Sequence, residues 1–245
     1  MNANDFDFEK IKNELHKILK EELGWPSYEY NARSWNKEDG SPVTNVDLRI
    51  SKFFEELCQS KNVKFLSEEN LTTLEFPVVI LDPVDGTKSL INQGKDWSVS
   101  FAYYQSKDIS DPRNFSWIYS PYNNTEISNE SKFSSNSRDD LLGFVSYNEY
   151  KEGLHKDCEG IKLKPVSSIA YKLGLLSIGE CDFVISRRPK GVWDIAAGAN
   201  LCAKSEINTY QNNQKIETLE HLEYKNDLLW CTDRVFQKLK GSGYI

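Results

Sequence analysis

The sequence predicts a mixed α/β protein, folded as one compact unit over residues 1–245. We expect an α+β part over 1–140 and an α/β part over 141–245. Residues 76–81 form a short apolar run rich in β-branched side chains, which is typical of a buried strand. Strand and helix patterns alternate after residue 141, as in α/β folds. Between the two parts, residues 120–140 are polar and turn-prone, which indicates a surface loop or lid at the boundary.

The first part contains two amphipathic helices and several short strands. Apolar residues recur at helical spacing over 5–23, and Gly24 is a natural stop. Residues 25–43 are expected to be irregular. A second helix follows Thr44, because Thr44 and Asp47 have the spacing of a capping box. Alternating or apolar runs predict strands over 63–66, 76–81, 97–104 and 114–119.

The second part alternates between the two patterns. The apolar side chains of residues 168–179 and 193–204 indicate helices, and a last short helix ends the chain. Strands are predicted over 142–147, 162–166, 181–186 and 228–232. This alternation predicts a sheet covered by helices.

Composition excludes several classes of function. The net charge is −7 and the pI is about 5.2, so a broad basic face for a nucleic-acid polymer or an anionic membrane is not expected. We see neither a signal peptide nor a membrane span. The five cysteines are scattered, which indicates buried thiols in a reducing cytoplasm. The three histidines have no metal-ligand spacing, which argues against His-based zinc chemistry.

The stretch 81–90 holds the strongest chemical signal. Two acids, Asp82 and Asp85, follow the predicted buried strand, and Pro83 stiffens the turn between them. Gly86 allows a sharp turn and a close approach to a ligand. A helix beginning at Thr87 would direct its first N–H groups at the same place. Carboxylates beside a helix N-terminus predict a site for a divalent cation and a phosphate.

Three further acids lie where a predicted strand ends or a helix begins. They are Glu68, Asp194 and, behind them, Asp47. Each also has a purely structural interpretation, namely a solvated loop for Glu68, a helix cap for Asp194 and a capping box for Asp47. Asp82 and Asp85 could likewise serve as Asx-turn formers. Together the acids favour a ligand site, because α/β folds gather ligands at such positions.

The motifs resemble those of the inositol monophosphatase family. The similarity is carried by residues 82–87 (DPVDGT), 193–198 (WDIAAG) and 67–69 (SEE), supported by 41–47 and 168–173, all in the family's order. The resemblance implies a layered α-β-α-β-α sandwich of the inositol monophosphatase/fructose-1,6-bisphosphatase type. It also implies a Mg-dependent, lithium-sensitive phosphomonoesterase that acts on a small phosphorylated substrate, in a family whose members are often homodimers.

The resemblance also implies residue roles. Glu68, Asp82 and the carbonyl oxygen of Val84 would hold one Mg²⁺, and Asp82, Asp85 and Asp194 a second, with a third, looser ion near Glu68 also allowed. Asp47 and Thr87 would orient the attacking water, and the N–H groups of Gly86 and Thr87 would hold phosphate oxygens. The substrate contacts would be Asp85, Gly86, Thr87, Lys88, Arg187 and Asp194.

Two basic residues favour a bisphosphate substrate. Lys88 resembles the residue common in the 3'(2'),5'-bisphosphate nucleotidase branch, and Arg187 stands near where inositol enzymes carry an acid. A guanidinium grips a phosphate but accepts no hydrogen bond from a sugar hydroxyl. We therefore expect hydrolysis of 3'-phosphoadenosine 5'-phosphate. The alternatives are an inositol-1-monophosphatase, a fructose-1,6-bisphosphatase-type sugar phosphatase, a non-catalytic regulatory member of the fold, and a plain α/β domain without a site.

Overall fold

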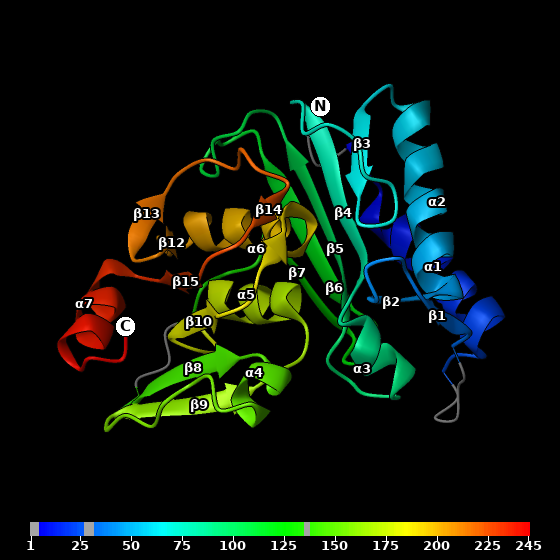
Figure 1. Cartoon of the computed structure of the whole chain (residues 1–245). Helices are drawn as coiled ribbons and strands as arrows, with labels where there is room; N and C mark the ends of the chain where they lie inside the picture. Colours follow the sequence, from blue (N-terminus) through cyan, green and yellow to red (C-terminus); the bar gives the residue numbers. More distant parts are fainter. Residues whose placement is uncertain (1–4, 27–31, 135–137) are drawn as a thin grey trace.

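The computed structural model describes residues 5–26, 32–134 and 138–245 (Figure 1). The expectation of no signal peptide concerns in part residues 1–4, which lie outside the described residues. The same holds for 27–31 of the expected irregular stretch and 135–137 of the expected loop. Within the described part, no helix combines the length and the apolar character that crossing a membrane would require. The five cysteine thiols are free, and all except Cys158 are buried.

A five-stranded sheet carries the motif-bearing strand β4 near one edge. The strand order is β3-β4-β5-β6-β7, with β3 parallel to β4 and the other pairs antiparallel. The strands are β3 (Lys64–Ser67), β4 (Val78–Asp85), β5 (Ser98–Tyr104), β6 (Phe115–Ser120) and β7 (Thr125–Ser128). All eight residues of β4 are buried, as its apolar run predicts.

A six-stranded sheet forms most of the second part, in the order β13-β12-β15-β10-β8-β9. Strands β9, β8 and β10 run parallel, and the others pair antiparallel. Its strands are β8 (Leu141–Val145), β9 (Ile161–Pro165), β10 (Phe183–Ser186), β12 (Asn208–Gln211), β13 (Gln214–Ile216) and β15 (Leu228–Cys231). Two small ribbons pair β1 (Ser34–Asn36) with β2 (Pro42–Thr44), and β11 (Lys190–Gly191) with β14 (Glu223–Tyr224).

Helices and sheets alternate in layers (Figure 1). Helices α1 (Phe8–Leu23) and α2 (Asn45–Ser60) share one apolar core with the outer face of the five-stranded sheet. Helices α5 (Ile169–Ser177) and α6 (Val192–Lys204) lie between the two sheets in a second core. Helix α7 (Asp233–Gly241) covers the far face of the six-stranded sheet in a third. This order confirms the predicted α-β-α-β-α sandwich. The short helices are α3 (Thr87–Ile91) and α4 (Tyr147–Lys151).

Several elements differ from the sequence prediction. Residues 120–140 are not wholly loop, because β7 pairs with β6 along the edge of the sheet. Three of its four residues are polar, and only Ile127 is buried, so its sequence has no strand pattern. The stretch 25–43 contains the β1–β2 ribbon, and helix α4 and strands β11–β14 were not predicted. The division at residue 140 stays a prediction, although the strands on either side of it belong to different sheets.

Candidate active site

The carboxyl end of β4 is irregular, and this irregularity shapes the site. Asp82 pairs with Ser100 of β5, whereas Asp85, three residues later, pairs with Ser98, only two residues earlier. The extra residue is a β-bulge. In a regular strand, side chains three positions apart point to opposite faces, so the bulge allows the two acids to face one cavity. The Val84 N–H donates to Asp82 Oδ1 at 3.0 Å and so fixes the first carboxylate.

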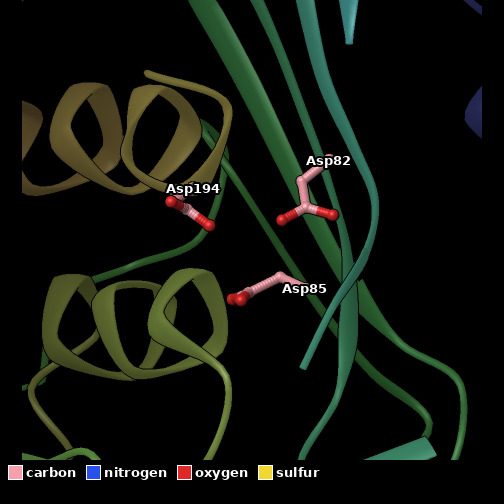
Figure 2. Close-up of side chains that lie close together, drawn as sticks. All are labelled: Asp82, Asp85 and Asp194. Carbon is pink, nitrogen blue, oxygen red and sulfur yellow. The ribbon is translucent and has the colours of Figure 1, made fainter. Parts of the chain in front are cut away.

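Asp194 joins these two acids from helix α6 (Figure 2). Carboxylate oxygens of Asp82, Asp85 and Asp194 all lie within 4.8 Å of one another. Asp194 is in the first turn of α6 and accepts from the Gly191 N–H at 2.6 Å. Asp85 accepts from the Ser168 hydroxyl and the Ala170 N–H at the start of α5. Two helix N-termini thus meet two of the carboxylates and partly offset their charge.

The three carboxylates are costly to ionise together. Burial and the neighbouring charges of Glu68 and Asp85 raise the pKa of Asp82 well above its ordinary value. Burial also raises the pKa of Asp85 to about 6, and burial with the charge of Asp85 raises that of Asp194 to about 7. A divalent cation would remove this cost, and hard oxygen donors are the ligands that Mg²⁺ prefers. The donor set therefore fits the magnesium that the sequence predicts.

Glu68 lies beside this triad and not within it. The Glu68 N–H donates to Leu81 O at 3.2 Å, which continues the parallel β3–β4 pairing and brings Glu68 next to Asp82. Its carboxylate pairs with Lys37 Nζ at 2.8 Å, and the same ammonium contacts Glu69 at 2.7 Å. Burial opposes the charge of Lys37, but the two carboxylates outweigh it and raise the Lys37 pKa.

Asp47 and Thr87 meet behind the triad. The Thr87 hydroxyl lies 3.3 Å from Asp47 Oδ1 and 2.9 Å from the carbonyl oxygen of Val84. Asp47 also accepts from Thr44 and completes the predicted capping box of α2. Burial raises the pKa of Asp47 to about 7. Both interpretations of Asp47 thus coexist, because one carboxylate oxygen caps the helix while the other faces Thr87.

A cavity of about 840 Å³ opens in front of these groups. Most of the predicted site residues line it: Glu68, Asp82, Val84, Asp85, Gly86, Thr87, Lys88 and Asp194. Asp47 is fully buried behind this lining and reaches the site through Thr87.

Arg187, the remaining predicted substrate contact, is not among the residues that line the cavity. Its guanidinium pairs with Asp227, in the segment before β15. Its backbone N–H donates to Glu149 Oε1 at 3.2 Å. This ion pair joins residues forty positions apart, so it could not be predicted from local sequence patterns.

Three lysines that line the cavity were not assigned to the site from the sequence, namely Lys95, Lys172 and Lys190. Lys172 is only 1% exposed, and its Nζ donates to Val166 O at 3.0 Å. Burial lowers the Lys172 pKa to about 8, although the charge of Asp85 opposes this shift. Lys190 precedes α6, on β11. A single lysine within the apolar helix 169–177 was an available signal, because buried lysines require a functional or charge-pairing reason.

Replacing Gly86 with Ala is expected to lower the unfolding free energy by about 2 kcal/mol and kcat/KM by roughly tenfold or more. Gly86 has φ +93°, and an added Cβ would lie 2.9 Å from Asp96 O, so β4 and α3 would have to shift. Thermal unfolding and steady-state kinetics measure both effects. Gly160→Ala is the matched control, because Gly160 has φ +75° but open space around it. Equal losses in both variants would contradict a special role for Gly86.

Comparison with known proteins identifies relatives along most of the chain. Residues 4–204 match the model of the inositol monophosphatase family. A 3'(2'),5'-bisphosphate nucleotidase CysQ of Haemophilus influenzae is 27% identical over 201 residues, covering 69% of this chain and 71% of that protein. The Thermotoga maritima IMPase TM1415 has a similar structure, with a TM-score of 0.74 at 17% identity, covering 97% and 98% of the two chains.

A second solved structure, an IMPase/NADP phosphatase complexed with Mg²⁺ and phosphate, is also similar. Its TM-score is 0.67 at 16% identity, and the match covers 96% of this chain and 93% of that one.

Proposed function

Because the chain belongs to the inositol monophosphatase family of phosphatases, we propose that it is a magnesium-dependent phosphomonoesterase that removes one phosphate from a 3'(2'),5'-bisphosphate nucleotide. The observation that carries the proposal is one cavity that contains both the aspartate triad and several lysines. The triad suits a cation and the phosphate it would bind. The lysines suit a second anionic group on the same substrate.

The proposed metal ligands are those with hard oxygen donors at the base of the cavity. Asp82, Asp85 and Asp194 would hold one Mg²⁺, and Glu68, Asp82 and the Val84 carbonyl a second. Bound magnesium would supply Lewis-acid stabilisation of the phosphoryl oxygens and lower the pKa of a water molecule. Glu68 is paired with Lys37, so this ammonium would have to move or share the carboxylate.

The remaining groups would position the reactants. If the Thr87 hydroxyl donates its proton to Asp47, its oxygen is left to accept a hydrogen bond from the attacking water and orient it. The backbone N–H groups of Gly86 and Thr87 would donate to phosphate oxygens. In this arrangement the chain needs no covalent nucleophile and no histidine base.

The basic side chains of the cavity support a bisphosphate substrate. Lys88, Lys95, Lys172 and Lys190 all line it. We propose that they bind the second phosphate; Arg187, predicted for the same role, is not among the residues that line the cavity. The name of the Haemophilus influenzae relative supports the nucleotide as the carrier of both phosphates. In the fructose-1,6-bisphosphatase alternative, the substrate also carries two phosphates but has no base.

A panel of phosphomonoesters with titrated Mg²⁺ tests this proposal. We expect kcat/KM on 3'-phosphoadenosine 5'-phosphate to exceed that on inositol 1-phosphate and fructose 1,6-bisphosphate by about 100-fold. Both of these substrates lack the base, and inositol 1-phosphate also lacks the second phosphate. EDTA should abolish the activity, and the Asp82→Asn variant serves as the background control. A clear preference for inositol 1-phosphate would overturn the proposed substrate, and Mg-independent turnover would overturn the proposed mechanism.

A further inference from the structure

Helix α4 places an exposed aromatic side chain on the wall of the active-site cavity. Tyr147 begins this helix and lines the cavity together with Ser146 and Asn148. Tyr147 is 57% exposed although it lines the cavity. No role was assigned to this residue from the sequence. An open tyrosine ring beside a cavity is suited to contact a flat, apolar part of a ligand.

A buried carboxylate anchors α4 beside the basic side of the cavity. Glu149 is fully buried, and its Oε1 accepts from the Ser186 hydroxyl at 3.1 Å and the Arg187 N–H at 3.2 Å, at the end of β10. Its other oxygen lies 3.2 Å from His155 Nε2. Hydrogen bonds to a buried charge are strong, so the short helix is held firmly in place.

The same carboxylate also interacts electrostatically with two lysines that line the cavity. Burial opposes the ionised form of Glu149, but the hydrogen bonds with His155 and the Arg187 N–H and the positive charges of Lys190 and Lys172 outweigh it and lower the Glu149 pKa to about 2. Lys172 and Lys190, whose charges act on Glu149, are among the lysines proposed to bind the second phosphate. Tyr147, two residues before Glu149, begins the same helix and lines the cavity that Lys172 and Lys190 also line. In a 3',5'-bisphosphate nucleotide the base is bonded to C1' of the ribose that carries both phosphates, so it lies within reach of the same cavity.

We propose that Tyr147 determines specificity by stacking on the base of the bound nucleotide. This inference rests on the proposed function and adds to it the residue that distinguishes a nucleotide from a sugar bisphosphate. Stacking on an aromatic ring tolerates any base, so Tyr147 would favour nucleotides as a class without selecting adenine.

The test compares two substrates that differ only in the base, 3'-phosphoadenosine 5'-phosphate and an abasic ribose 3,5-bisphosphate. Tyr147→Ala should raise KM for the nucleotide about tenfold with kcat nearly unchanged, and should leave KM for the abasic substrate unchanged. Tyr147→Phe should retain the wild-type KM, because stacking requires the ring and not the hydroxyl. Calorimetric binding of adenosine 5'-monophosphate, in the presence of Mg²⁺, should weaken by a similar factor in Tyr147→Ala.

Tyr150→Ala is the matched control. Tyr150 lies on the same helix and is 48% exposed, but it does not line the cavity, so its removal should change neither substrate's KM. An equal KM for the nucleotide in wild type and Tyr147→Ala would overturn the inference while leaving the proposed function intact. An equal rise in KM for both substrates in Tyr147→Ala would overturn the inference in the same way. A wild-type protein that hydrolyses inositol 1-phosphate but neither bisphosphate would overturn the proposed function, and the inference with it.

Discussion

Replacing Asp82 with Asn is expected to lower Mg-dependent phosphatase activity by about 10³-fold or more, while raising the stability of the metal-free protein. Asp82 is the member of the triad with the most acidic neighbours, since Glu68, Asp85, Asp194 and Asp47 all raise its pKa after burial. An amide keeps the shape and can still accept from the Val84 N–H. It cannot ionise, so the cost of burying a carboxyl group that is charged in the unfolded chain disappears, which stabilises the metal-free fold. It also removes the ligand proposed to bridge both ions, which costs several kcal/mol of transition-state stabilisation.

The opposite signs of these two effects make the experiment specific. Activity and thermal unfolding are measured with EDTA and with saturating Mg²⁺, and Mg²⁺ should stabilise the wild type much more than the variant. Asp157→Asn is the control, because Asp157 is exposed and should change neither quantity. A variant that loses activity and also loses metal-free stability would indicate a structural role for Asp82. A variant with normal Mg-dependent activity would contradict the proposed site.

The layers and the triad could be predicted because they depend on local patterns. The apolar run before Asp82 identifies a buried strand, and the position of Asp194 in a helix cap places it at a helix N-terminus. Both features are encoded within a few residues. The resemblance of the motifs to the family then predicted that these distant segments meet in one site, which local patterns alone do not indicate. The family match over residues 4–204 confirmed that resemblance.

The details that the sequence did not reveal depend on partners distant along the chain. Arg187 was predicted as a substrate contact, and its guanidinium forms an ion pair with Asp227, forty positions away. Strand β7 is defined by its pairing with β6 and not by its own polar residues. The bulge after Asp82 shows only in the register against β5. Pairings of this kind are set by tertiary structure, which overrides local propensity.

Lowering the pH from 8 to 5 is expected to stabilise the metal-free protein by roughly 5 kcal/mol, a rise in Tm of about 10–20 °C. Burial raises the pKa of Asp47 and Asp194 to about 7 and that of Asp85 to about 6. In the unfolded chain an Asp titrates near 4, so between about 4 and 7 the folded state binds more protons than the unfolded state. The stability from these groups is therefore complete below about pH 4 and is lost as the pH rises through 7.

Magnesium should reverse this dependence, because bound cations favour the ionised carboxylates. The stabilisation by saturating Mg²⁺, measured as the difference in Tm from an EDTA sample, should be large at pH 8 and small at pH 5. In Asp82→Asn the metal-free protein should show a weaker pH dependence, since one carboxyl group with a raised pKa is gone. A metal-free Tm that falls steadily from pH 8 to 5 would show that these carboxylates are already ionised and compensated without metal. The triad would then be a set of helix caps, Asp85 for α5 and Asp194 for α6, and the magnesium site would have to be sought elsewhere.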